Sequence, residues 1–229
     1  MQAELERVLA VVLRRPAVAL TVAGRTDAGV HASEQVASYA GDPAPVGALN
    51  ALLPDDVSVI ACQPAPRGFS ARRDATSRVY CYRLLTRASR SAHEPWAALH
   101  WPGSIDRGQL DGCAAALAGR HDFTAFTPTE TNHVRFSREV FAAHWRDAGP
   151  DHLEFWIEAD AFLRHMNRIL VGTMLEVARG RRSLAGFTAL LSGRPRCEAG
   201  PTASPRGLSL ARVGYGGERI LAPGGKRAR

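Results

Sequence analysis

The stretch Ala23-Gly-Arg-Thr-Asp-Ala-Gly-Val-His-Ala32 decides how this sequence is interpreted. It follows an apolar, strand-like run at 17–22 and sets one carboxylate, Asp27, between two glycines, with Arg25 two residues before it. Glycine permits positive φ and lets a ligand approach the backbone closely, so such a loop can present one side chain at a sharp turn. A carboxylate presented in this way can act as a nucleophile. Because Asp and Gly are also common turn formers, a plain turn is the alternative interpretation.

The composition is that of a globular protein. The 229 residues are 45% hydrophobic and 22% charged, which allows one large domain or two small ones. No apolar run approaches the roughly 20 residues of a membrane helix and the start lacks a signal-peptide pattern, so a cytoplasmic protein is expected. The net charge of +7 comes almost entirely from arginine. Arginine binds phosphates and stacks on bases, which favours a nucleic-acid partner, although a GC-rich genome would also raise its frequency.

Hydrophobic periodicity predicts an α+β fold. Helices are expected at 2–13, 45–53, 110–117, 162–178 and 184–191, and strands at 17–22, 35–40, 57–61, 78–85, 136–145, 152–159 and 208–213. The Pro- and Gly-rich segment 63–69 predicts a boundary between an N-terminal half-domain, 1–68, which carries the Asp27 loop, and a C-terminal half-domain, 69–222. The basic end, 223–229, is expected to be disordered.

Arg168 lies where the predicted helix 162–178 becomes apolar on nearly every side, a pattern that implies burial. A buried arginine needs an anionic partner. Asp27 would satisfy this need and would itself be held in position. Another acid, or escape of the guanidinium to solvent along its aliphatic stem, is the alternative.

Tyr80 and Tyr82 alternate along the predicted strand 78–85, so they share one face of it. Aromatic rings on a sheet face can stack an unpaired base, worth ~1–3 kcal/mol per base, whereas ordinary core packing is the plainer alternative. The sequence has no Rossmann fingerprint and no P-loop. Its cysteines lack the spacing of a zinc site or of a disulfide framework: Cys62, Cys81, Cys113 and Cys197.

Several segments, in order, resemble the tRNA pseudouridine synthase A family. They are the Asp27 stretch, 75–82, 119–126, 162–172 and 201–215, and the similarity extends over roughly 3–215. This resemblance implies two α+β half-domains, each a mostly antiparallel sheet with helices on one face, and an active-site cleft between them. It further implies a homodimer that isomerises uridine to pseudouridine at positions 38, 39 and 40 of the tRNA anticodon stem-loop, without cofactor, ATP or metal.

The same resemblance implies roles for individual residues. Asp27 would attack the ribose or the uracil, or would take a ribose proton, and Arg168 would pair with it. Tyr80 would stack on the target uracil and take part in proton transfer. Arg25 would fill the gap left when the target base leaves its stack, a phosphate contact being the alternative. Leu208 would lie under the uracil, and phosphate contacts are expected from Arg72, Arg73 and Arg78.

The chain departs from the family pattern at its start, where members carry a strand and a Tyr-Asp-Gly…Gly-Trp-Gln-like segment. Here Met1 leads directly into the first predicted helix. Loss of a strand would leave sheet-edge groups uncovered. A misassigned start codon or a fragment would explain the departure, and so would a reduced protein with weakened folding, dimerisation or catalysis.

Two other functions compete with this interpretation. The first is an RNA-binding or RNA-chaperone protein on the same fold, with weak or no catalysis. The second is an Asp27-based hydrolase or phosphotransferase, which would need magnesium and further acidic ligands. No acidic cluster accompanies Asp27 in the sequence.

Overall fold

The computed structural model describes residues 1–221, so the tail expected at 223–229 lies outside the described residues. Contacts divide the chain into a smaller unit, Met1–Arg25 with Gln35–Ala75, and a larger unit that contains Thr26–Glu34 and the chain from Thr76 onward. The division therefore falls later than the expected boundary at residue 68, and the Asp27 loop groups with the larger unit. Helices and strands are mixed in both units, which confirms the α+β class.

The smaller unit contains α1 (Gln2–Val12), β1 (Thr21–Val22), β3 (Ala37–Ser38) and α2 (Val46–Asn50). β1 pairs with β3 in antiparallel orientation. Apolar side chains from the helices and from the segments beside them form its core: Val8, Leu9, Val18, Leu20, Leu49 and Leu53.

Side chains, rather than neighbouring strands, bind much of the backbone in this unit. The amide of Leu20 donates to Glu6 Oε1 at 3.0 Å, and Gln2 Nε2 donates to the Leu20 carbonyl at 3.1 Å, so β1 is shorter than the expected strand 17–22. The strand predicted at 57–61 is wrong. There, Asn50 Nδ2 donates to the Val59 carbonyl at 2.9 Å and the Val59 amide donates to Asn50 Oδ1 at 2.7 Å.

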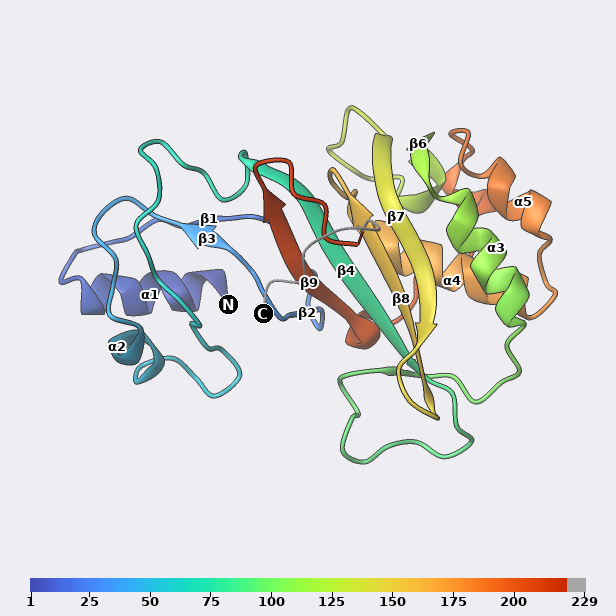
Figure 1. Ribbon diagram of the computed structural model, residues 1–229, viewed down its shortest axis with the longest axis horizontal. Helices are drawn as coiled ribbons and strands as arrows, with labels where there is room; N and C mark the ends of the chain where they lie inside the picture. The colour runs from blue at the N-terminus through green and yellow to red at the C-terminus, as the bar shows by residue number, and fades with distance from the viewer. Residues whose placement is uncertain (222–229) are drawn as a thin grey trace. The chain divides into compact units, whose positions relative to one another are not determined.

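The larger unit is built on a seven-stranded sheet in the described part of the chain, with the order β2-β9-β4-β8-β7-β6 and β5 beside β4 (Figure 1). The strands are β2 (His31–Ala32), β4 (Ala75–Leu85), β5 (Leu99–His100), β6 (Gly119–Asp122), β7 (Ser137–Asp147), β8 (His152–Ala159) and β9 (Leu208–Tyr215). β4, β8, β7 and β6 pair with one another in antiparallel fashion, whereas β2 is parallel to β9 and β5 to β4. The long strands were expected, and the short β2, β5 and β6 were not.

Three helices lie on one side of this sheet: α3 (Arg107–Ala116), α4 (Met166–Ala178) and α5 (Leu184–Ala189) (Figure 1). They cover the face formed by alternate residues of the central strands, including Tyr82, Trp145, Leu153, Phe155 and Ile157. α4 is buried along almost its whole length, as its apolar sequence predicts. Within residues 1–221, no helix combines the length and apolarity needed to cross a membrane.

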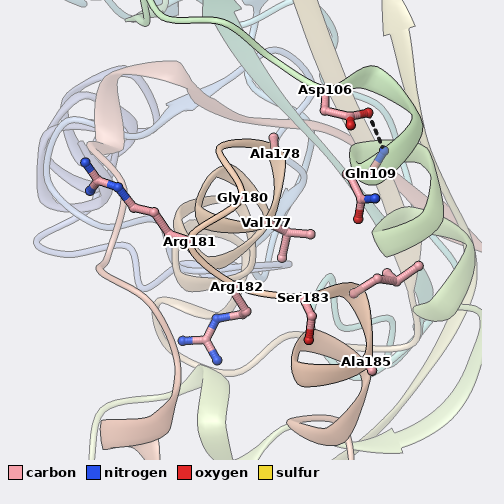
Figure 2. Close-up of a pocket in the computed structure, with 10 residues that line it drawn as sticks. Asp106, Gln109, Val177, Ala178, Gly180, Arg181, Arg182, Ser183 and Ala185 are labelled. Carbon is pink, nitrogen blue, oxygen red and sulfur yellow. Dashed lines mark hydrogen bonds between the residues drawn. The ribbon is translucent and has the colours of Figure 1, made fainter.

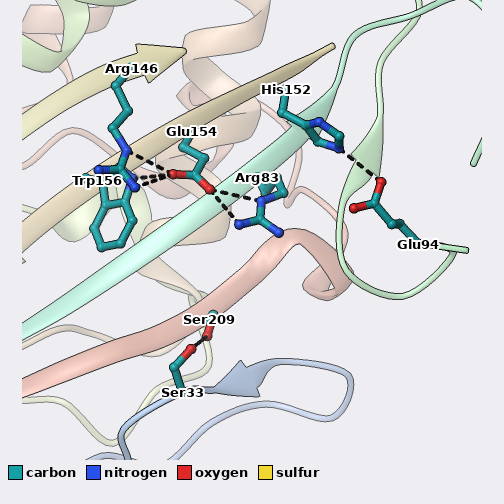
Figure 3. A network of polar contacts seen from close by, with 8 residues as sticks. All are labelled: Ser33, Arg83, Glu94, Arg146, His152, Glu154, Trp156 and Ser209. Atoms are coloured by element: carbon teal, nitrogen blue, oxygen red, sulfur yellow. Dashed lines mark hydrogen bonds and ion pairs between the residues drawn. The ribbon is translucent and has the colours of Figure 1, made fainter. Parts of the chain in front are cut away.

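The opposite face of the same strands carries a buried carboxylate, Glu154, which is 2% exposed. Arg83 and Arg146 approach its two oxygens at 2.7 and 2.8 Å, and Trp156 Nε1 donates to it at 2.8 Å (Figure 3). Burial alone would raise the pKa of Glu154, but these three hydrogen bonds bring the pKa below its ordinary value. The network ties three neighbouring strands together through side chains.

α4 begins at Met166 rather than at Phe162, where the sequence predicted its start. His165 precedes the helix with φ +61°, in the left-handed region, and a non-glycine residue in that conformation cannot continue a right-handed helix. The Met166 amide donates to the Leu163 carbonyl at 3.2 Å, which closes a turn before the helix. This turn sets the direction of the His165 side chain.

Candidate active site

The Asp27 loop is fixed to the edge of the larger sheet. β2 follows the loop and pairs with β9, with His31 opposite Ser209, and the Ser33 amide donates to the Leu210 carbonyl at 2.9 Å. The hydroxyls of Ser33 and Ser209 face each other at 3.3 Å (Figure 3). Pairing with a distant strand therefore determines where the loop lies in this unit.

Asp27 itself opens a tight turn. The Val30 amide donates to the Asp27 carbonyl at 3.1 Å, and Gly29 has φ +80° at the position where a type II turn requires positive φ. The two interpretations of the sequence, a plain turn and a loop that presents a carboxylate, are therefore compatible, because the turn projects the Asp27 side chain.

Arg168 forms an ion pair with Asp27. Its Nη1 donates to Asp27 Oδ2 at 2.9 Å, and the two side chains are 14% and 30% exposed. The guanidinium makes a second hydrogen bond, in which Nε donates to the Ala203 carbonyl at 2.8 Å. In return, the Ala203 amide donates to the Arg168 carbonyl at 3.0 Å. Arg168 therefore reaches Asp27 from a fixed position on α4.

His165 is a third member of this cluster, and sequence reasoning did not identify it. Its Nε2 lies 3.3 Å from the same Asp27 Oδ2. Burial lowers the pKa of His165 below its ordinary value, Asp27 opposes this effect, and nearby arginines add to it. The available signal was its position three residues before Arg168 within the predicted helix 162–178, although in the structure His165 precedes α4.

The contacts of Asp27 are made by one oxygen. Arg168 and His165 both approach Oδ2, and among the described residues Oδ1 has no hydrogen-bond or ion-pair partner. Oδ2 therefore fixes the orientation of the carboxylate, and Oδ1 is available for chemistry. A nucleophile or a general base needs this combination.

Tyr80 lies on β4 and packs its ring edge-on against Phe162, with 5.0 Å between ring centres and 77° between planes. Its side chain is largely buried, at 8% exposed. Burial raises the pKa of Tyr80 to about 12, with Arg78 opposing and Asp27 adding to the effect. Tyr82 is a core residue whose hydroxyl donates to the Ser204 carbonyl at 2.7 Å.

The other predicted site residues are divided between the two units. Leu208 begins β9 in the larger unit and is buried, and Arg78 on β4 donates from Nη1 to the Asp160 carbonyl at 2.9 Å. Arg25, Arg72 and Arg73 belong to the smaller unit. Arg73 pairs there with Asp74 at 3.2 Å.

A pocket of about 610 Å³ lies away from these residues, at the end of α4 (Figure 2). Two of its polar side chains have structural partners: Asp106 Oδ1 accepts from the Gln109 amide at 3.0 Å at the start of α3, and Arg182 pairs with Glu176 at 3.1 Å. Residues 1–221 contain no group of three or more His, Cys, Asp or Glu side chains arranged to hold a metal ion.

Comparison with known proteins identifies the family. The chain is 38% identical to tRNA pseudouridine synthase A of Myxococcus xanthus over 216 residues, which covers 91% of this chain and 81% of the relative. The chain belongs to the tRNA pseudouridine synthase A family. The protein of that name from Chlorobaculum tepidum is 40% identical over 93% of this chain and 87% of its own. That from Geobacillus kaustophilus is 38% identical, over 96% and 87% respectively.

A family model described as tRNA pseudouridine synthase also matches residues 113–216, a range that contains α4 and the segment packed on it. The resemblance seen in the sequence is thereby confirmed. Pseudouridine synthases are isomerases, so the chain is an enzyme of that class. The Asp27 loop lies outside the matched range.

Proposed function

We propose that this chain converts uridine to pseudouridine in tRNA, at positions 38, 39 and 40 of the anticodon stem-loop, with Asp27 as the nucleophile. The observation that carries the proposal is the Asp27 carboxylate, held through Oδ2 by Arg168 in a chain of this family. The net charge of +7 favours a polyanionic substrate.

The reaction is an isomerisation within one nucleotide. The bond between ribose C1′ and uracil N1 breaks, a bond between C1′ and C5 forms, the proton on C5 leaves to solvent and N1 gains a proton. Asp27 would attack the ribose or the uracil, or would remove a ribose proton. Each route needs one free carboxylate oxygen, which Oδ1 supplies while Arg168 and His165 hold Oδ2.

Tyr80 would contact the flipped uracil. Burial raises its pKa from 10 to about 12, so the phenol is protonated at neutral pH, as an ordinary tyrosine is, and it can donate a hydrogen bond to the uracil. Leu208 would lie beneath the uracil. Arg25 would take the place of the flipped base, and phosphate contacts would come from Arg72, Arg73 and Arg78. The enzyme would act as a cytoplasmic homodimer that grips one tRNA with both subunits and uses no cofactor.

The test uses an anticodon stem-loop RNA that carries tritium at uracil C5, because forming the C1′–C5 bond releases that label. We expect tritium release from the unaltered chain and its loss in Asp27→Asn. Asp55→Asn is the matched control, since Asp55 is exposed and the substitution removes the same charge. Equal release from the wild type and Asp27→Asn would remove Asp27 from the chemistry. RNA binding without any release would instead support the RNA-chaperone alternative.

A further inference from the structure

An exposed tryptophan and an exposed arginine are stacked on each other in the larger unit. Trp96 is 60% exposed, and it is the only aromatic among the large apolar side chains exposed within residues 1–221. The Arg206 guanidinium carbon lies 3.9 Å from the centre of its ring. An exposed indole of this kind lowers its free energy when a further flat group covers it.

This pair is attached directly to the Asp27 loop. His31 Nε2, at the end of that loop, donates to the Trp96 carbonyl at 2.6 Å. Gly29 lies against Pro205, the neighbour of Arg206, so closely that a Cβ on Gly29 would be 3.1 Å from Pro205 Cγ. Arg206 Nη1 also approaches the Pro95 carbonyl at 3.5 Å. The stacked pair therefore keeps a defined position relative to the turn that presents Asp27.

The segment that carries Arg206 is also held by hydrogen bonds to residues of β4 and α4. Two residues before it, the Ser204 carbonyl accepts the hydroxyl of the buried Tyr82 at 2.7 Å. Ala203 exchanges hydrogen bonds with Arg168. Residues 203–206 thus connect the guanidinium that holds Asp27 with the exposed stacked pair.

We propose that Trp96 and Arg206 form a stacking platform for an unpaired RNA base that flanks the target nucleotide, an inference that rests on the proposed function. Loop bases of RNA are recognised by stacking on aromatic rings and on guanidinium planes, and the platform offers both. Its attachment to the Asp27 turn would set the distance between the stacked base and the reacting uridine. The site would tolerate any base, because every base has a flat face.

The test measures the dissociation constant and the single-turnover rate with anticodon stem-loop RNA for the wild type, Trp96→Ala, Trp96→Phe and Arg206→Ala. We expect Trp96→Ala to bind roughly 5- to 150-fold more weakly, with the salt dependence of binding unchanged, because stacking releases no counterions. Trp96→Phe should retain most of the affinity. Arg120→Ala is the control for Arg206→Ala, since Arg120 is an exposed arginine on β6, at the other edge of the sheet.

A scan of abasic sites through the RNA loop identifies the stacked nucleotide. At one position, removal of the base should weaken the binding of the RNA to the wild type. The same removal should cause no further loss of affinity for Trp96→Ala, and this non-additivity is the coupling expected of a direct contact. Melting temperatures verify that each variant is folded.

The outcomes separate the two proposals. If the wild type forms pseudouridine while Trp96→Ala binds and reacts like it, the platform is refuted and the proposed function stands. If the wild type binds RNA without reaction and Trp96→Ala binds more weakly, the stacking contact with RNA stands, whereas the proposed function fails and with it the placement of that base beside a target nucleotide. Absence of RNA binding by the wild type refutes both.

Discussion

Replacing Arg168 by lysine tests how the carboxylate is held. The guanidinium makes two separate contacts: Nη1 donates to Asp27 and Nε donates to the Ala203 carbonyl. These donors point in different directions from one rigid plane, whereas the lysine ammonium is a single point of charge on a flexible stem. Arg168→Lys should therefore preserve the positive charge but lose one of the two contacts.

The magnitude follows from the burial of the pair. A hydrogen bond to a charged group contributes about 1.5–3 kcal/mol, and the lower half of this range applies because Asp27 is 30% exposed. If the missing contact acts in the transition state, a loss of about 1.5–2 kcal/mol slows the reaction roughly 10- to 30-fold. RNA affinity should change little, since the Arg168 side chain is only 14% exposed and acts through Asp27.

The assay is single-turnover tritium release at saturating enzyme, with the dissociation constant and the melting temperature measured on the same samples. Arg120→Lys is the control, because Arg120 forms an exposed ion pair with Glu139 and such pairs contribute little. A folded Arg168→Lys enzyme that reacts within twofold of the wild type would refute the requirement for the two-point contact. Weakened RNA binding with an unchanged rate would refute the positioning role.

Two further predictions concern α4 and the residue that precedes it. In Gly172→Ala, the added Cβ would overlap the Pro201 carbonyl oxygen and push away the segment that holds Arg168. Urea unfolding should therefore show a free energy of unfolding lower by about 1–3 kcal/mol, and tritium release should be slower. A variant as stable as the wild type would contradict this packing. The pKa of His165 is lowered in the folded state, so as the pH falls the unfolded chain binds a proton at this residue before the folded chain does. The contribution of neutral His165 to stability is therefore complete above about pH 6.5, and it is lost as the pH falls through the pKa of the folded state. His165→Asn tolerates the positive φ and should show a shallower loss of stability between pH 7.5 and 5.5 in urea titrations, and an identical pH dependence would show that His165 is not responsible.

Local patterns predicted the elements whose formation depends on nearby residues. The alternation of Leu153, Phe155 and Ile157 indicated β8, and all three side chains are buried beneath the helices. The continuous apolar sequence after Arg168 indicated a buried helix, which α4 is. Both predictions succeed because side-chain period and burial follow from the backbone geometry of a single element.

Predictions failed where distant side chains bind the backbone. The segment 17–20 is as apolar as a strand, yet Glu6 and Gln2 of α1 bind the backbone of Leu20. The segment 57–61 similarly gives its Val59 hydrogen bonds to Asn50. Propensity records which conformation a segment favours but not which groups will reach it, and here those groups decide the outcome.

The sequence by itself determined the α+β class and the turn around Asp27, because apolar periodicity and glycine conformations act over a few residues. Tertiary structure alone decided which groups meet. Asp27 and Arg168 are 141 residues apart in the chain, and their contact depends on β2 pairing with β9 and on residues 200–203 packing along α4. The left-handed conformation of His165, which ends the turn and brings the imidazole to Asp27, is likewise a product of the packed structure, because an isolated chain rarely adopts it.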